Sequence, residues 1–160
     1  KASTARAVQY ARYYPEGQRG ISPMWTKVAG VDWNEVIKTA NEETVLVIQL
    51  ESQQAYDNLD EIKQVPGIDV ILVGPLDLSA AVGTITDTGS KQVQEIMEDV
   101  PRRLEGTGIA TGTTLMDPAE IQQKIRWGYR FLNVGSALGY GAQVLDDHLK
   151  TLRTDPRGEG

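Results

Sequence analysis

TVLVIQLE (residues 44–51) is an apolar run that ends in the carboxylate of Glu51. A second run, DVILVGPLD (residues 69–77), ends in Asp77. Aliphatic and β-branched residues follow one another without polar alternation, which is typical of parallel strands covered on both faces. Such strands bind ligands at their carboxyl ends. The two runs therefore predict an α/β fold with two acidic side chains at one ligand-binding edge.

The remaining segments alternate between helical and strand patterns. Apolar spacing and Gly or Pro stops predict helices over 3–11, 33–40, 53–62, 93–104, 118–127 and 142–152, with further strands over 109–115 and 131–134. Asp32 and Asp117 are expected N-caps, Pro101 is expected to split or kink its helix, and residues 135–141 are expected to form a Gly-rich turn. Four strand–helix units in series require parallel strands joined by right-handed crossovers.

Composition narrows the class of protein. The chain has 160 residues and no cysteine, which excludes disulfides, thiolate metal sites and cysteine catalysis. A net charge of -6 argues against nucleic acid or an anionic membrane surface as a partner. No apolar stretch approaches the ~18 residues of a membrane span, and no signal peptide is visible, so a cytoplasmic location is expected. We expect one domain over residues 1–153 and a flexible tail over 154–160.

The two carboxylates predict a metal site. Two acidic side chains at the same ligand-binding edge repel each other unless a cation lies between them. Gln49 and Glu51 point the same way because side chains alternate along a strand. Mg²⁺ or Mn²⁺ suits two carboxylates completed by water and substrate oxygens. The alternative is that Glu51 and Asp77 each face a helix N-terminus, where the dipole favours an acid.

GPLDLS (residues 74–79) follows the second strand. Gly74 lets the backbone approach a ligand closely, and the amides after it could hold a carboxylate or a phosphate where a helix begins. The alternative is a plain strand-to-helix turn.

Several motifs together resemble one family. They are YPEGQRG (14–20), VIQLES (47–52), NLDEI (58–62), PGID (66–69), VGPLDLS (73–79), WG (127–128) and NVG (133–135). On these motifs the chain resembles the HpcH/HpaI aldolases, class II metal-dependent pyruvate aldolases of the hydroxy-oxo-heptanedioate type. The resemblance implies a (β/α)8 TIM barrel of the phosphoenolpyruvate/pyruvate type, of which this chain supplies the C-terminal half.

The resemblance also implies a metal site of known composition. Glu51 and Asp77 would be the ligands of Mg²⁺ or Mn²⁺, with Co²⁺ as a further possibility. Gln49 would support a metal-bound water or the substrate. The metal would bind the carboxylate and the 2-oxo oxygen of pyruvate, and would stabilise the enolate formed when the carbon–carbon bond breaks.

Substrate contacts follow from the same resemblance. Gly74, Pro75, Leu76 and Asp77 would surround the substrate carboxylate, which the amides of Leu76 and Asp77 would hold. Thr114 would line the aldehyde side. The substrates implied are an oxo acid, either pyruvate or an oxaloacetate-like acid, and an aldehyde.

The chain departs from the family pattern in length. A complete barrel needs ~250 residues and eight strands. The family's catalytic histidine, its paired acid and an arginine belong to the first half, so the catalytic residues are unknown here. Ser136 stands where many relatives carry an acid, and Leu76 where a small residue is common. The open sheet would need the rest of the barrel or another chain. The family tends to form hexamers as trimers of dimers, which would place residues 142–152 at an interface.

The sequence therefore predicts a metal-dependent aldolase or lyase. It would cleave or form a carbon–carbon bond in 4-hydroxy-2-oxo acids through a pyruvate enolate. One alternative is a related lyase or decarboxylase on the same site, of the citryl- or malyl-CoA type or similar to macrophomate synthase. The other is a truncated paralogue that binds metal without catalysis.

Overall fold

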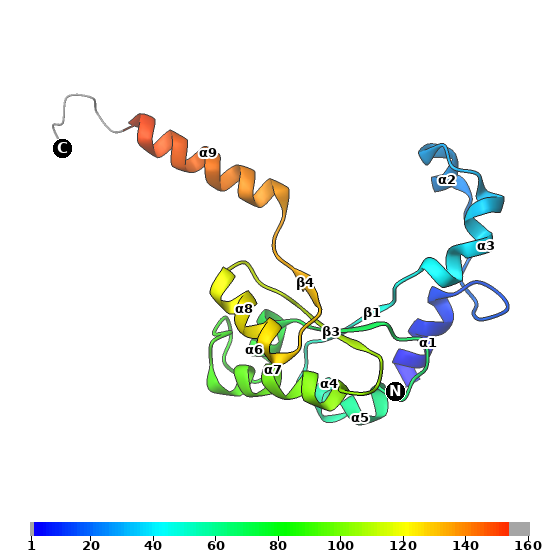
Figure 1. Ribbon diagram of the computed structural model, residues 1–160, viewed down its shortest axis with the longest axis horizontal. Helices are drawn as coiled ribbons and strands as arrows, with labels where there is room; N and C mark the ends of the chain where they lie inside the picture. The colour runs from blue at the N-terminus through cyan, green and yellow to red at the C-terminus, as the bar shows by residue number, and fades with distance from the viewer. Residues whose placement is uncertain (1, 154–160) are drawn as a thin grey trace.

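Four parallel strands form the centre of the molecule. The computed structural model describes residues 2–153 (Figure 1). The strands are β1 (Val47–Leu50), β2 (Val70–Val73), β3 (Ala110–Thr114) and β4 (Phe131–Asn133), and they lie in this order in the sheet. In the register, Gln49 lies opposite Leu72, and Leu72 lies opposite Gly112. The predicted α/β architecture of four strand–helix units, half of a barrel, is confirmed.

Nine helices connect and flank these strands within residues 2–153. They are α1 (Ala2–Ala11), α2 (Met24–Ala29), α3 (Trp33–Glu43), α4 (Gln53–Asp57), α5 (Leu59–Ile62), α6 (Pro75–Ala81), α7 (Lys91–Leu104), α8 (Pro118–Trp127) and α9 (Ala137–Arg153). The predicted caps are confirmed: Asp32 accepts a hydrogen bond from the amide of Asn34, and Asp117 accepts from two amides of α8. α7 runs through Pro101 without a break.

The sequence-based prediction of helices is wrong at three places. α2 was not predicted, because its six residues are too short to show a periodic pattern. The helix predicted over 53–62 breaks at Asn58, whose side-chain amide donates to the carbonyl of Gln54 at 2.7 Å. The Gly-rich turn predicted over 135–141 is mostly the start of α9, because the Ser136 hydroxyl accepts from the amide of Gly139 at 3.0 Å and caps the helix.

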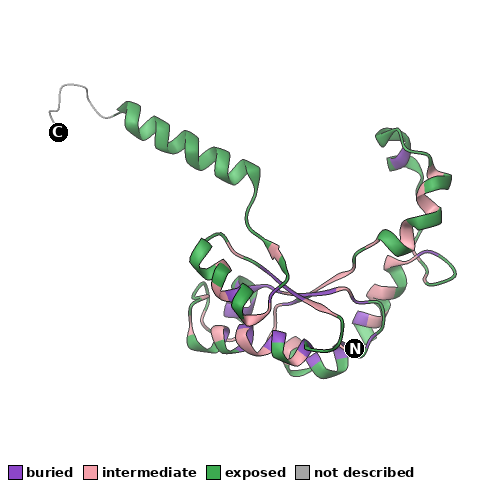
Figure 2. Cartoon of the chain, viewed as in Figure 1, coloured by how far each residue is buried: buried purple, intermediate pink, exposed green. Residues whose placement is uncertain are grey.

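The core lies between one face of the sheet and the helices from α4 to α8 (Figure 2). Its most buried side chains include Leu50, Leu59, Ile71, Val73, Leu78, Val93, Met97, Val100 and Tyr129. On the opposite face Gln49 is exposed and Phe131 is 40% exposed. The prediction that these strands are covered on both faces is therefore wrong for the outer strands β1 and β4, whereas every residue of β2 is buried or half-buried. The helices of this chain cover only the outer face, whereas the other face of a barrel strand packs against strands that the chain does not contain.

Arg12 joins the N-terminal helices to the sheet. Its guanidinium donates to the carbonyls of Asn41 and Thr44, the second at 2.7 Å, and lies 3.3 Å from the Asp69 carboxylate. The same carboxylate oxygen accepts from the amide of Leu46 at 2.7 Å. One side chain thus links α1, the end of α3 and the beginnings of two strands.

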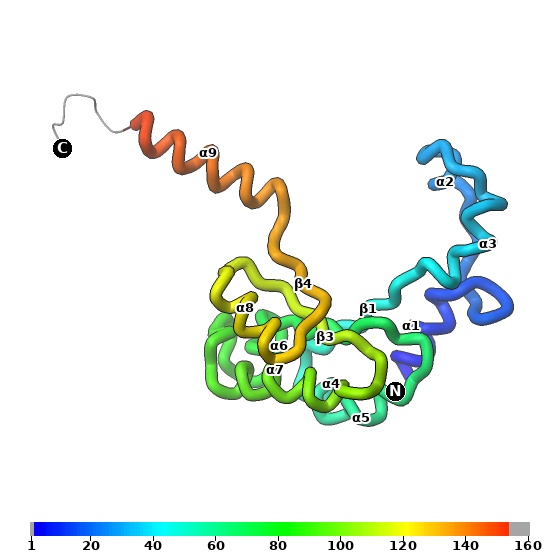
Figure 3. The backbone as a smooth tube through the Cα atoms, viewed as in Figure 1, coloured from blue at the N-terminus to red at the C-terminus, as the bar shows by residue number. Residues whose placement is uncertain are grey.

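Two segments of the described chain project away from the sheet. α2 and α3 lie on one side, and α9 extends on the other (Figure 3). α9 has no buried residue, and Leu138 and Leu152 are 83% and 79% exposed. The flexible tail predicted for 154–160 lies outside the described residues. Within residues 2–153 no helix has both the length and the hydrophobicity needed to cross a membrane.

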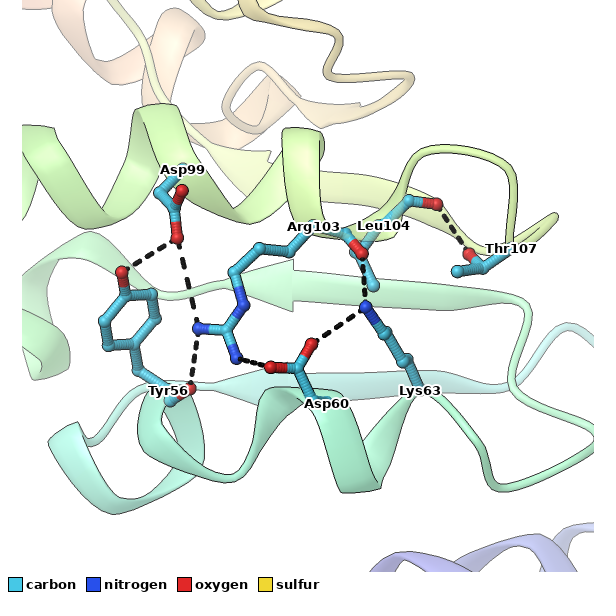
Figure 4. A network of polar contacts seen from close by, with 7 residues as sticks. All are labelled: Tyr56, Asp60, Lys63, Asp99, Arg103, Leu104 and Thr107. Atoms are coloured by element: carbon cyan, nitrogen blue, oxygen red, sulfur yellow. Dashed lines mark hydrogen bonds and ion pairs between the residues drawn. The ribbon is translucent and has the colours of Figure 1, made fainter.

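A polar network holds α4 and α5 against α7 (Figure 4). Asp60 lies 2.8 Å from the Lys63 ammonium and 2.8 Å from the Arg103 guanidinium. Arg103 also donates to the carbonyl of Tyr56, whose hydroxyl donates to Asp99 at 2.9 Å. The bond from Lys63, and then that from Arg103, lowers the pKa of Asp60.

Asp60→Asn is expected to destabilise the fold in a pH-dependent way. Because the folded pKa of Asp60 is below its unfolded value, its contribution is complete above the unfolded pKa and is lost as pH falls through the folded pKa. Urea unfolding should give a lower free energy of unfolding for the variant than for wild type at about pH 7, and equal free energies at about pH 2. Glu61→Gln is the control, since the Glu61 side chain makes no hydrogen bond or ion pair with any described residue. A difference that persists in acid would contradict the linkage.

Candidate metal and substrate site

Glu51 and Gly74 meet at the carboxyl ends of β1 and β2. Leu50 lies opposite Val73 in the register, so the next residues of both strands are neighbours. The amide of Gly74 donates to the carbonyl of Leu50 at 3.1 Å. A Cβ atom added to Gly74 would lie 3.3 Å from Oε2 of Glu51. The Glu51 carboxylate therefore lies against the Gly74 backbone, in space that the missing side chain leaves free.

Asp77 enters the same region from the first turn of α6. Gly74 is the N-cap of this helix and Pro75 its first residue, where the fixed φ of proline suits a helix start. The first intrahelical bond runs from the amide of Leu78 to the carbonyl of Gly74 at 2.9 Å. The amides of Leu76 and Asp77 are thus outside the ladder of this helix.

A hollow of about 410 Å³ opens at this edge of the sheet. It is lined by Gln49, Leu72, Gly74, Pro75, Leu76, Asp77, Thr88, Thr114, Leu115 and Met116. Every residue predicted to contact substrate is in this set, and Glu51 adjoins it at Gly74. Elements from three strand–helix units therefore meet at one site.

Sequence reasoning missed four residues of this hollow, Leu72 in β2 together with Thr88, Leu115 and Met116. Leu115 and Met116 directly follow Thr114 at the end of β3, a position that could have identified them as residues of the same edge. Thr88 comes from the loop before α7, and its place at the site depends on contacts distant in sequence. Two other residues, Ser136 and His148, lie outside the hollow, and Ser136 serves as the cap of α9.

The polar side chains of the site fit a hard divalent cation. Within residues 2–153 the side chains of Gln49, Glu51 and Asp77 make no hydrogen bond or ion pair, so their oxygens are free to bind a ligand. No described group of three or more His, Cys, Asp or Glu side chains gathers here or elsewhere. Two carboxylates are nevertheless sufficient, because Mg²⁺ is commonly bound by one or two carboxylates together with water and substrate oxygens.

Gly74→Val is expected to weaken Mn²⁺ binding by about 10- to 100-fold, the range found when the support of a metal ligand is lost. The backbone of Gly74 has φ -90°, which valine tolerates, but the added side chain would occupy the space of the Glu51 carboxylate. Isothermal titration calorimetry measures the affinity. Gly20→Val is the matched control, since nothing lies within 4 Å of a Cβ at that position. Equal affinities in the two variants would refute the role given to Gly74.

A model of the HpcH/HpaI aldolase/citrate lyase family matches residues 1–142. The chain belongs to this family. One relative, 2-keto-3-deoxy-L-rhamnonate aldolase of Klebsiella pneumoniae, is 39% identical over 158 residues, which is 96% of this chain and 58% of that enzyme. The chain thus spans less than two thirds of the length of this relative, and the resemblance found in its motifs is confirmed.

Solved structures of the HpcH/HpaI family agree with the half-barrel architecture. A family protein from Burkholderia cenocepacia superposes with a TM-score of 0.81 at 28% identity, over 96% of this chain and 61% of that protein. Macrophomate synthase superposes with a TM-score of 0.74 at 20% identity, a likeness that shows the fold alone. In these two comparisons the matched part corresponds to 61% and 55% of the other protein's chain.

Proposed function

We propose that this chain supplies the metal-binding half of a divalent-metal-dependent aldolase, a carbon–carbon lyase that acts on 4-hydroxy-2-oxo acids. One observation carries the proposal: two carboxylates without a hydrogen-bond or ion-pair partner among residues 2–153, Glu51 and Asp77, flank the close turn at Gly74 beside a hollow of substrate size. The location of this site at the carboxyl ends of parallel strands supports the proposal.

Each residue of the site has a role in this proposal. Glu51 and Asp77 hold Mg²⁺ or Mn²⁺, with Co²⁺ as a further candidate. The bound cation supplies Lewis acidity for the negative charge that develops on an oxo-acid oxygen. The amide of Gln49 donates a hydrogen bond to water or substrate at its side of the hollow. The amides of Leu76 and Asp77 hold the substrate carboxylate, and Thr114 contacts the aldehyde portion.

The substrate class follows from the family and from the chemistry. The Klebsiella relative is named for a 2-keto-3-deoxy sugar acid. Breaking the bond between carbons 3 and 4 of such an acid leaves pyruvate and an aldehyde. We propose a substrate of this class, with the general acid and base supplied by the residues that complete the barrel.

The exposed strand edges and apolar surfaces of this chain are where the remaining strands of the barrel, or another subunit, would pack. The free edges of β1 and β4 and the face around Phe131 would be covered by the remaining strands, either from the rest of the barrel or from another chain. The apolar side chains of α9, among them Leu138 and Leu152, would pack against another subunit of a homo-oligomer, a hexamer in the family's usual form. We propose that the assembly works in the cytoplasm.

Pyruvate release from a 4-hydroxy-2-oxo acid tests the proposal. The assay is run with and without Mn²⁺, on the 160-residue chain alone and on the chain combined with the first half of the Klebsiella relative. We expect metal-dependent turnover in the combination and none in the chain alone. Mn²⁺ binding with no turnover in either sample would favour the truncated metal-binding paralogue instead.

A further inference from the structure

The loop between α6 and α7, residues 82–90, forms one wall of the hollow through Thr88. Two contacts hold the ends of the loop: the amide of Thr84 donates to the carbonyl of Ser79 in α6 at 2.8 Å, and the hydroxyls of Thr84 and Ser90 lie 3.0 Å apart. These bonds shape the loop, but they do not attach its Thr88 segment to the helices behind it.

That attachment comes from Gln94 in the first turn of α7. Its side-chain nitrogen donates to the carbonyl of Thr88 at 2.7 Å. Its side-chain oxygen accepts from the ammonium of Lys124 on α8 at 2.6 Å. Both ends of one amide are therefore used, and a continuous chain of hydrogen bonds runs from α8 through α7 to the wall of the hollow.

Lys124 is an unusual residue for its surroundings. It is 1% exposed, its ammonium lies 3.9 Å from the centroid of the Trp127 ring, and it makes no ion pair within residues 2–153. Burial lowers the pKa of Lys124, while the charges of Glu120 and Glu98 act in the opposite direction. Burying an ammonium without a carboxylate is costly, and an aliphatic side chain would fill the same volume at lower cost.

The ammonium supplies something that an aliphatic side chain cannot. It is a donor without acceptor capacity, so it selects the oxygen of the Gln94 amide. The nitrogen of the same amide must then face the opposite direction, toward the carbonyl of Thr88. Lys124 thereby fixes which end of Gln94 meets the loop.

We infer that Lys124 is a positioning residue of the proposed site, which acts through Gln94 to fix Thr88 and the wall that its loop contributes to the substrate hollow. The inference rests on the proposed function for the identity of the ligand. The hydrogen bonds themselves do not depend on it. Because Thr88 lines the same hollow as Thr114, the wall meets the aldehyde part of the substrate.

Gln94→Glu separates positioning from folding. A carboxylate still accepts from Lys124, now as an ion pair, but it cannot donate to the carbonyl of Thr88. We expect the melting temperature to be unchanged or higher and the Mn²⁺ affinity to be unchanged. Amide hydrogen exchange over residues 84–90 should be about 10-fold faster, the effect of losing one hydrogen bond. Gln92→Glu is the control, because Gln92 is exposed on the same helix.

Two further measurements complete the test. Lys124→Met should raise exchange over the same loop, since the orientation of the Gln94 amide is no longer selected. In the barrel completed with the first half of the Klebsiella relative, Gln94→Glu should raise KM for the oxo acid by about 5- to 10-fold, with kcat changed less.

The inference would be overturned if Gln94→Glu and Lys124→Met both exchanged their loop amides no faster than Gln92→Glu does. It would also be overturned if these variants exchanged amides faster over the whole chain and melted at a lower temperature. If wild-type protein binds no Mn²⁺, the proposed function fails, while the exchange result still decides whether Lys124 and Gln94 position the loop.

Discussion

Glu51→Gln is expected to abolish Mn²⁺ binding and to leave the secondary structure intact. The substitution keeps the size of the side chain but removes one of the two negative charges at the site. The carboxylate makes no hydrogen bond or ion pair within residues 2–153, so its loss leaves no described group without a partner. Loss of a direct ligand should exceed the ~10- to 100-fold effects seen when only the support of a ligand is removed.

Calorimetry measures the Mn²⁺ affinity of Glu51→Gln, and far-ultraviolet circular dichroism measures its secondary structure. Glu61→Gln is the matched control, because it removes an equal charge from the exposed surface of α5. Unchanged Mn²⁺ affinity in Glu51→Gln would show that the metal assignment is wrong. The acid would then be interpreted as a helix-terminal charge, the alternative that the sequence left open.

Arg12→Met is expected to lower the free energy of unfolding by about 3 kcal/mol. The arginine side chain is 11% exposed and donates to two carbonyls and to the Asp69 carboxylate. Methionine keeps much of the aliphatic volume but leaves these acceptors without their donor. Since the contacts join α1 and α3 to the sheet, the N-terminal segment should also exchange its amides faster than the core.

Arg6→Met provides the comparison for Arg12→Met. Arg6 lies on α1, the helix that Arg12 directly follows, is exposed, and makes no hydrogen bond or ion pair with any described residue. Urea unfolding should give a free energy of unfolding for Arg6→Met within about 0.5 kcal/mol of the wild-type value. A similarly small change in Arg12→Met would mean that the N-terminal helices are held by packing alone.

The edge that carries the site could be predicted from the sequence because its signals are local. The apolar runs before Glu51 and Gly74 define the strand ends, parallel pairing brings such ends together, and Asp77 follows in the first turn of α6. The place of Gly74 was also readable, since a glycine directly after a strand permits close approach. What the sequence could not show is that the Glu51 carboxylate lies against Gly74, 3.3 Å from the position that a Cβ atom would take.

Other features depend on contacts that no local pattern carries. Thr88 reaches the hollow through Gln94 and Lys124, a connection that spans two helices. The uncovered sheet face around Phe131 reflects the absence of the facing strands rather than any property of the local residues. The start of α9 was predictable in principle, because Ser136 is a good N-cap residue, but two glycines in the first turns obscured it.

The strand order has a consequence for how this fold can evolve. Each strand pairs with the one that follows it in the chain, so a cut between two units divides the sheet at one pair of neighbouring strands and leaves every other pair intact. Under the proposed function, a half that carries the cation ligands can therefore be recombined with different first halves, provided that their outer strands align with β1 and β4. Recombination would exchange the catalytic acid, base and acceptor preference as one block, while the oxo-acid end of the reaction stays with this block of sequence.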